Sequence, residues 1–572
     1  MKNYKKVYAA FILAGGLILH GCNGIFDDLA INPNQPSMGA YFTSPSAVND
    51  AVMTMYGYMS TQRCLGASGS KTTIIRSDEA SSNSDYGKPG MFGADLNASY
   101  YTIEQPYTLM YTTASQASYI IETAPSVDFS GNEELRNAYM GEAYFWRAFA
   151  HYYLLINFRN ISPIRQMPRN GDDYVRPLEK PAAVWNFIQE DLAHAKELLP
   201  VKGYWDSKNA GRVTKASAAA LLGKAYLYRS GIEQYYGEDK TTFYSEAAKE
   251  FGDVIDGKYG TYDLTKNYAD NFDVAHENNE ESILEFQFLG DVDNAGFNPG
   301  LATSGLAFDS RGLMLPGAGV GYEGVVHNWL YNAFVNSVDK DCYTDIRMFS
   351  TMIFNDLDAS IHLRNDAGGN PVRLEGPGGY KWEELYPAKN GKEGFATVSN
   401  PLAHSFKAGI RKGIDCSMPT QTEADGTPKL VGVGAGVKEY VYNQPRAHGV
   451  NWRYIRYADV LMMYAEAIVS GGTQASNMTP LQAVNKVRGR VNMSELPSVT
   501  MTDIQNERIL EFALEGHRFY DLLRWGKLAS RFTELQESDP NFKKFISADD
   551  FKGFVTNKHE WLPIPINEVN SN

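Results

Sequence analysis

The sequence predicts an all-α protein whose paired helices are interrupted by loop-rich insertions. Three observations predict this class. Apolar residues recur every three or four positions in several long segments, and alanine lines several predicted helix faces. Segments rich in Gly, Asn, Asp and Pro make up much of the remaining sequence. Because alanine lets helices approach closely, the apolar faces are expected to pack as helical hairpins.

Two long helices are predicted in the N-terminal half. The segment "NEELRNAYMGEAYFWRAFAHYYLLINF" (132–158) has one apolar stripe, formed by Leu135, Tyr139, Ala143, Trp146, Ala150 and Tyr153. In "GRVTKASAAALLGKAYLYRSG" (211–231), Thr214 is suited to the N-cap and Gly231 to the helix end. The small-residue face of this second helix consists of Ala218, Leu222 and Ala225.

Two further helices are predicted near the C-terminus. The segment "RYADVLMMYAEAIVSGG" (456–472) ends in glycine, and its apolar face consists of Ala458, Leu461, Ala465 and Ile468. In "MTPLQAVNKVRG" (478–489), Thr479 is suited to the N-cap and Pro480 to the first helical position.

One helix pair matches the tetratricopeptide repeat in part. Leu222, Gly223 and Tyr226 fit its L-G-x-x-Y half, and Ala247 and Phe251 fit its A-x-x-x-F half. The intervening loop is about a dozen residues longer than the motif allows, and Ala219 occupies the tryptophan position. The sequence therefore predicts degenerate tetratricopeptide-like pairs.

The N-terminus has the pattern of an export signal. Three lysines (Lys2, Lys5, Lys6) precede an apolar run from Val7 to Leu19, which is too short to span a bilayer comfortably. The run ends in Leu19-His20-Gly21-Cys22, which resembles the lipobox of bacterial lipoproteins. We expect residues 1–21 to be cleaved and Cys22 to be lipidated; the alternative is a plain secreted protein with a stray cysteine.

Composition excludes several classes of protein. A net charge of -14 without a basic run argues against nucleic-acid binding and against electrostatic binding to anionic lipid. The other cysteines, Cys64, Cys342 and Cys416, are too few and too widely spaced for a disulfide scaffold or a C-x-x-C motif, although one bridge remains possible. No two of the ten histidines lie within one helical turn of each other, so no local zinc motif exists.

One acidic stripe could be catalytic. Glu507, Glu511 and Glu515 recur every four residues on one predicted helix face, and a glycosidase needs two carboxylates. A buried ion network is favoured, because like charges on one stripe need cations among them. The expected cations are Arg508, Arg518 and Arg524. The same structural role is predicted for Glu142 with Arg147, and for Arg456 with Asp459 and Glu466.

Other catalytic or metal-binding motifs fail. "LGASGSKTT" (65–73) lacks the glycines of a phosphate loop, and "DVDNAG" (291–296) lacks the later ligands of a calcium loop. No G-x-S-x-G sequence is present. We therefore expect neither a catalytic residue nor a metal or cofactor.

Several motifs together resemble a known family. The lipobox, "GEAYFWRAFAHYYL", "GRVTKASAAALLGKAYLY", "RYADVLMMYAEA", "NERILEFALEGHRFYDLLRWG" and "WLPIP" occur in the order seen in SusD/RagB-type surface glycan-binding lipoproteins. The resemblance implies an all-α body of four tetratricopeptide-like units, a variable ligand face and a SusC-like, TonB-dependent outer-membrane transporter as partner. "IFDD", just after Cys22, looks like the tract that routes such lipoproteins to the cell surface.

The domain prediction follows from this organisation. Residues 22–572 are expected to form a single SusD-like domain, with helical repeats in about 40–260 and 450–530 and a variable loop-rich region in about 286–450.

The candidate ligand residues lie outside the helix stripes. A sugar site needs exposed rings for C–H faces and polar groups for hydroxyls. The candidates are Asn83, Asp85 and Tyr86, then Asp309, Arg311 and Tyr322, then Tyr380 and Trp382. For each of them, ordinary loop packing is the alternative.

The leading interpretation is a non-catalytic lipoprotein, anchored at the outer-membrane surface, that binds oligosaccharides or polysaccharide and delivers them to the transporter. The same scaffold binding peptides, as in RagB-like relatives, is the second interpretation, and a surface glycosidase is the third.

Overall fold

The computed structural model describes residues 42–61, 63–66, 69, 71–82, 98–167, 176–288, 324–376, 379–397, 405–412, 430–432, 438–440, 450–539 and 554–571. The leader and Cys22 therefore lie outside the described residues, as do Cys416 and the segment 291–296.

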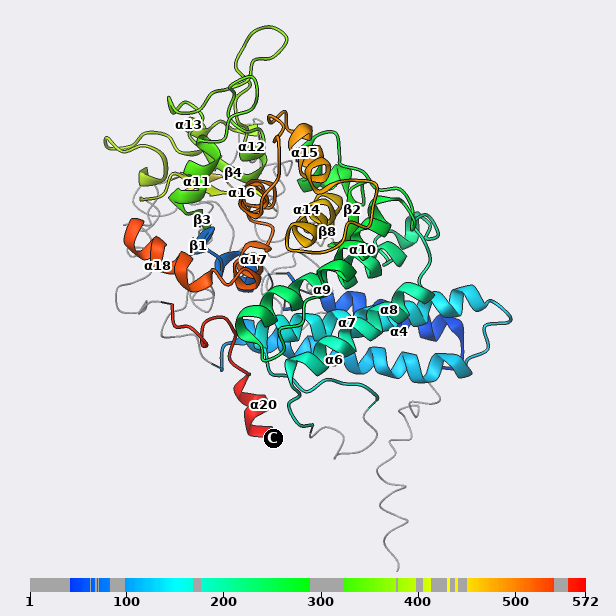
Figure 1. Cartoon of the computed structure of the whole chain (residues 1–572). Helices are drawn as coiled ribbons and strands as arrows, with labels where there is room; N and C mark the ends of the chain where they lie inside the picture. The colour runs from blue at the N-terminus through cyan, green and yellow to red at the C-terminus, as the bar shows by residue number, and fades with distance from the viewer. Residues whose placement is uncertain are drawn as a thin grey trace, which may run out of the picture.

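The N-terminal half is a layered array of helices in which neighbours along the chain pack side by side (Figure 1). Its helices are α4 (Pro45–Met59), α6 (Tyr101–Thr123), α7 (Glu133–Phe158), α8 (Pro181–Leu198), α9 (Lys215–Tyr236) and α10 (Tyr244–Ile255). Helix α7 is capped by Asn132, whose side chain accepts the N–H of Leu135. From Ala138 onward almost every residue of α7 is buried, because α6 and α8 cover its two sides.

The packing of α9 against α10 confirms the predicted tetratricopeptide-like pair. A Cβ at Gly223 in α9 would lie 2.7 Å from the ring of Phe251 in α10, so only glycine allows this approach. Thr214 caps α9 as predicted, and its backbone N–H donates to the Ser217 hydroxyl.

The predicted end of α9 at Gly231 is wrong. The helix continues to Tyr236 and ends before Gly237. Glycine is needed at 231 because a Cβ there would lie 2.5 Å from the backbone oxygen of Arg524. The residue therefore serves helix packing and does not terminate the helix.

The C-terminal helices pack against this array. They are α14 (Tyr457–Val469), α15 (Pro480–Arg490), α16 (Met501–Glu511), α17 (Arg518–Arg524), α18 (Leu528–Ser538) and α20 (Ile566–Ser571). The predicted start of α15 is confirmed: Thr479 and Gln482 form a reciprocal capping box with Pro480 at the first helical position. With few strands elsewhere, the predicted all-α class is confirmed.

Short strands join segments that are distant in the chain. An antiparallel sheet has the order β1 (Ala80–Ser82), β3 (Gly324–Val326), β5 (Ala408–Ile410) and β4 (Met352–Phe354). A second sheet pairs β2 (Ser282–Phe286) with β8 (Trp452–Arg456), and a third pairs β6 (Leu430–Gly432) with β7 (Lys438–Tyr440). Short helices α11 (Asn328–Val335), α12 (Arg347–Thr351) and α13 (Trp382–Leu385) accompany the four-stranded sheet (Figure 1).

Candidate functional site

The four-stranded sheet joins two of the predicted ligand segments. Strands β1 and β3 pair antiparallel, with Ser82 opposite Gly324. The segment that carries Asn83, Asp85 and Tyr86 begins directly after Ser82, and the segment that ends with Tyr322 and Glu323 leads into Gly324. The described ends of both segments therefore lie side by side at one end of the sheet.

A buried polar cluster anchors the opposite end of this strand pair, where Ala80 lies across from Val326. The Ser81 hydroxyl lies 2.6 Å from Nε2 of His327, and Nδ1 of His327 lies 2.8 Å from the backbone oxygen of Asp78. The Asp78 carboxylate accepts hydrogen bonds from Arg518 at 2.9 Å and from Arg531 at 2.6 Å. Burial alone raises the pKa of Asp78, but the two guanidinium groups hold it below its ordinary value. Strand β1 is thereby tied to the C-terminal helices.

The neighbouring carboxyl group behaves differently. Glu79 accepts the backbone N–H of Leu514 and the hydroxyl of Ser77, but no cation pairs with it among the described residues. Burial therefore raises the pKa of Glu79 to about 8.

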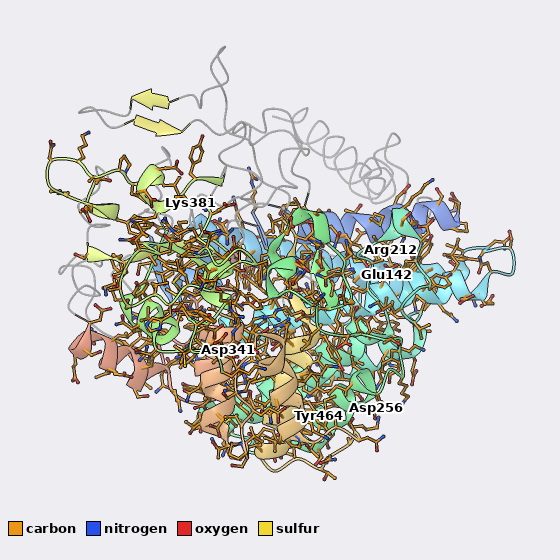
Figure 2. All side chains as sticks on the ribbon, turned by 90° about the horizontal axis from the view of Figure 1, so that it is seen from above. Glu142, Arg212, Asp256, Asp341, Lys381 and Tyr464 are labelled. Carbon is orange, nitrogen blue, oxygen red and sulfur yellow. The ribbon has the colours of Figure 1, made fainter. Side chains whose placement is uncertain are left out.

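The third predicted ligand segment lies beside β4. A Cβ at Gly376 would contact Ile353 of β4 and Leu385 of α13. Tyr380 is half-buried. The next residue, Lys381, is labelled in Figure 2, and its ammonium pairs with the Glu375 carboxylate at 2.9 Å.

The expectation that Trp382 is exposed is wrong. Its side chain is 7% exposed, and its ring centroid lies 4.6 Å from that of Tyr386 and 5.0 Å from that of Phe395. Gly394, at φ +60°, lets the backbone approach this ring closely. Trp382 therefore serves first as the core of a small aromatic cluster, and its contact with a ligand stays a prediction.

The remaining candidates lie outside the described residues. They are Asn83, Asp85, Tyr86, Asp309, Arg311 and Tyr322. Their role as ligand contacts stays a prediction.

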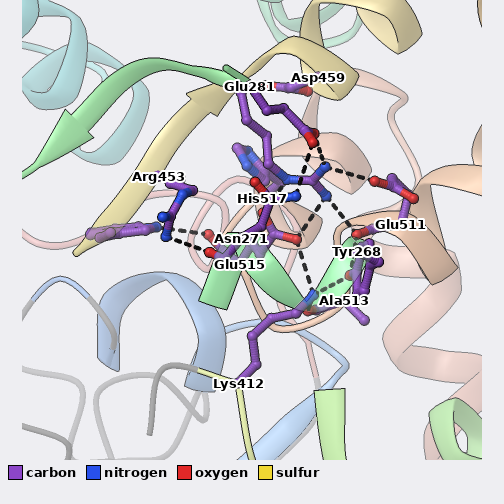
Figure 3. Close-up of polar contacts among 12 residues, drawn as sticks. Tyr268, Asn271, Glu281, Lys412, Arg453, Asp459, Glu511, Ala513, Glu515 and His517 are labelled. Atoms are coloured by element: carbon purple, nitrogen blue, oxygen red, sulfur yellow. Dashed lines mark hydrogen bonds and ion pairs between the residues drawn. The ribbon is translucent and has the colours of Figure 1, made fainter. Parts of the chain in front are cut away.

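The acidic stripe forms a buried ion network, as favoured above (Figure 3). Nη1 of Arg347 donates to Glu507 and, at 3.0 Å, to Glu511. Glu515 lies beyond the end of α16, in a turn where Leu514 and Gly516 have positive φ. Arg456 joins the network by donating to Glu511 and Glu515, and also to Glu281.

The predicted partners within these ion pairs were wrong. The cations that contact the three glutamates are Arg347, Lys412, Arg456, Arg488 and Arg490. Arg508 instead pairs with Asp459 and Asp521, Arg518 with Asp78, and Arg524 with Glu466 and Asp521.

The other predicted ion pairs are also wrong, because these residues pair with different partners in the structure. Glu142 pairs with Arg212 (Figure 2), and Arg147 pairs with Asp191. Arg456 contacts neither Asp459 nor Glu466 among the ion pairs of the described residues. Each true partner lies far away in the chain, so helical spacing alone could not identify it.

This network is unsuited to glycoside hydrolysis. Burial alone raises the pKa of Glu511 and Glu515, but the surrounding cations lower both below the ordinary value. A general acid needs a raised pKa and access to substrate, whereas Glu511 is fully buried and Glu515 is 6% exposed. The geometry therefore favours a structural role.

Metal sites and membrane spans are not found in the part of the chain that the structure describes. No cluster of three or more His, Cys, Asp or Glu side chains is arranged to bind a metal there. Cys64 and Cys342 are free thiols. None of the described helices is long and apolar enough to cross a bilayer.

Two family models match the chain. One, described as "Starch-binding associating with outer membrane", matches residues 31–227, and the model of the SusD family matches residues 427–572. A SusD-like protein of Bacteroides ovatus is 24% identical over 532 residues, which cover 92% of this chain and 83% of that protein. SusD-like protein P2 of Formosa agariphila is 24% identical over 92% of this chain and 91% of its own.

Solved structures share the fold. A SusD superfamily protein of Bacteroides vulgatus aligns with a TM-score of 0.66 at 22% identity, over 93% of this chain and 98% of its own. A laminarin-binding SusD-like protein aligns with a TM-score of 0.61 at 22% identity, over 93% and 98% of the two chains. Surface glycan-binding protein A of Bacteroides thetaiotaomicron gives a TM-score of 0.65 at 18% identity over the same shares. From these matches and its helical architecture, the chain belongs to the SusD/RagB-like family.

Proposed function

We propose that this chain is a lipoprotein of the outer-membrane surface that captures an oligosaccharide or polysaccharide and delivers it to a SusC-like, TonB-dependent transporter. The observation that carries the proposal is the pairing of Ser82 with Gly324, which brings together the described ends of two loop-rich segments with predicted sugar-binding residues. The family membership supports the same ligand class, since one matching family is described as starch-binding.

The ligand face we propose lies at the end of the four-stranded sheet where Ser82 pairs with Gly324. Tyr86 and Tyr322 supply rings for the apolar C–H face of a sugar, and Asn83, Asp85, Asp309 and Arg311 supply hydrogen-bonding groups for its hydroxyls. The strands that lead into these segments are anchored at their other end by the buried cluster of Asp78 with Arg518 and Arg531. Rigid anchoring of this kind lowers the entropic cost of ordering a loop-built site.

The role we propose is capture without chemistry. The acidic network is buried and neutralised by cations, so it offers no general acid. Lipidation at Cys22 would hold the protein at the membrane without a membrane-spanning segment. Such tethering raises the effective ligand concentration at a transporter mouth, so even weak binding is useful.

Binding and partnership can be tested with the same protein. Tagged lipoprotein, extracted in mild detergent, should bring down a large β-barrel partner. The same preparation should bind at least one polysaccharide of a broad glycan array and leave it uncleaved. Binding only to peptides would favour the RagB-like alternative, and cleavage of the bound polysaccharide by the unmodified protein would favour a glycosidase.

A further inference from the structure

A pocket of about 530 Å³ lies among the C-terminal ends of α9, α14 and α17 and the N-terminal ends of α10 and α16. Helices α9 and α17 lie side by side there (Figure 1). None of its lining residues belongs to the four-stranded sheet, so the pocket is separate from the ligand face proposed above. Its volume lies within the range of about 300–1,000 Å³ that is usual for small-molecule sites.

The rim of this pocket holds an unusually exposed ring. The Tyr235 side chain is 54% exposed, and it is the only aromatic residue among the strongly exposed large hydrophobic side chains of the described ranges. Its ring packs against Gly526, where a Cβ would lie 2.5 Å away and where φ is +64°. Glycine at 526 therefore supports the ring from one side and leaves the remainder of the ring open.

The floor of the pocket is already neutralised. Arg524 donates to both carboxylate oxygens of Glu466, and the indole N–H of Trp525 donates to the same carboxylate. These groups are buried and fixed in position. The floor therefore has little capacity to bind a strongly charged ligand.

Polar groups with unused hydrogen-bonding capacity line the same pocket as the Tyr235 ring. Among the described residues, the hydroxyls of Thr242, Ser470 and Thr502 make no side-chain hydrogen bond. Gln505 accepts from Lys527 at 2.6 Å through its oxygen, while its amide nitrogen has no acceptor within the same ranges. Hydroxyls both donate and accept, and an amide NH₂ donates twice, which is the set that sugar hydroxyls need.

We infer that this pocket is a second saccharide site, which binds one pyranose unit with its apolar face on Tyr235 and its hydroxyls toward Gln505 and Thr502. An aromatic ring beside hydroxyl and amide groups, with the Lys527 ammonium as one charged donor, over a neutralised floor fits sugar recognition. Only the ligand class is shared with the proposed function. A second site on the same chain would strengthen the binding of long glycans by avidity.

The test uses saturation-transfer NMR on the full chain in an amine-oxide detergent, which has no sugar headgroup. The probes are the methyl pyranosides of glucose, galactose, mannose and xylose at millimolar concentration. A Tyr86→Ala/Tyr322→Ala background removes the proposed ligand face. In this background at least one probe should still show saturation transfer, and adding Tyr235→Ala or Gln505→Leu should reduce it at least about fivefold.

Two control variants accompany these changes. Tyr235→Phe keeps the ring and should keep the signal, and Leu178→Ala changes another exposed side chain and should have no effect. Absence of transfer in the background overturns the second site and leaves the proposed function untouched. A residual signal that Tyr235→Ala does not change also overturns it. The saturation transfer in the Tyr86→Ala/Tyr322→Ala background could equal that of the parent protein and be abolished by adding Tyr235→Ala. That result would support the second site and count against the proposed ligand face.

Discussion

Arg456 donates from Nη1 to Oε1 of Glu511 at 2.6 Å, and both side chains are completely buried. Glu511 also accepts from Arg347 and Arg490, so three cations converge on one carboxylate. Their charges lower the pKa of Glu511 despite a burial effect that raises it. One carboxylate at the end of α16 thus links this helix to the first residue of α12, the last residue of β8 and the last residue of α15.

Replacing Glu511 with Gln should destabilise the protein strongly. The variant keeps the shape of the side chain but leaves the buried network of guanidinium groups one negative charge short, although each arginine keeps another carboxylate partner. Removing one partner of a buried ion pair typically costs about 3–5 kcal/mol. We expect a clear fall in the midpoint of thermal unfolding and lower expression. Glu534→Gln is the matched control. Glu534 pairs with Arg531 at the surface, so this change should leave the midpoint of thermal unfolding almost unchanged. Equal midpoints for Glu511→Gln and the parent protein would contradict this role.

Glu79 should make stability fall between pH 5 and pH 8. Its folded pKa is raised to about 8, so the native state keeps a proton that the unfolded state loses above its ordinary pKa near 4.5. Stability from this group is therefore full below that ordinary pKa and declines by up to about 1.4 kcal/mol per pH unit until the folded pKa is reached. Unfolding midpoints in urea, measured at pH 5, 6, 7 and 8, should decline less steeply in Glu79→Gln. Parallel profiles for the two proteins would show that Glu79 ionises normally.

The sequence predicts features that depend on local chemistry. The start of α15 followed from Thr479 and Pro480, since an N-cap and an N1 proline act within one turn. The pairing of α9 with α10 followed from the partial tetratricopeptide match, and the structure adds the contact between Gly223 and Phe251. Both needed only residues within one helix pair.

Features that depend on tertiary partners could not be predicted in this way. Arg347 and Glu281 lie more than a hundred residues from the glutamates and arginines that they pair with, so helical spacing suggested Arg508 instead. Gly231 is a residue type typical of helix ends, but here it lies inside α9 and lets this helix pack closely against the backbone of Arg524. Of the candidate ligand residues, the burial of Trp382 depends on Phe395, which only the folded chain brings beside it.

Gly223→Ala should lower stability through overpacking. The new Cβ would lie 2.7 Å from the Phe251 ring, and relieving such an overlap typically costs about 1–3 kcal/mol. Gly57→Ala in α4 is the matched control: no atom lies within 4 Å of its Cβ position, and alanine favours a helix over glycine by up to about 1 kcal/mol. The unfolding midpoints of the two variants should therefore move in opposite directions. A shift of the same sign would mean that the α9–α10 contact is looser than described.

Cys22→Ala should release the protein from the membrane fraction and leave its fold intact. Lipid chains provide the proposed attachment, at about 0.8 kcal/mol for each buried methylene, and the net charge of -14 offers no electrostatic substitute. Fractionation of cells followed by a salt wash measures the release, and circular dichroism measures the fold. Variant protein that still pellets with outer membranes after the wash would exclude lipid as the anchor.

The three predicted ring contacts should separate into two classes. Tyr86→Ala and Tyr322→Ala should weaken glycan binding by roughly 1–3 kcal/mol for any ring that stacks on the ligand, judged from aromatic burial. Trp382→Ala should chiefly lower stability, by about 3–5 kcal/mol, because its ring packs against Tyr386 and Phe395 and is 7% exposed. Isothermal titration with the best glycan of the array measures the first effect, and thermal unfolding of the same samples measures the second. Unchanged affinity in both tyrosine variants would remove these rings from the ligand face. A stable Trp382→Ala protein with reduced affinity would return Trp382 to that face, because only a ligand contact could then account for the loss.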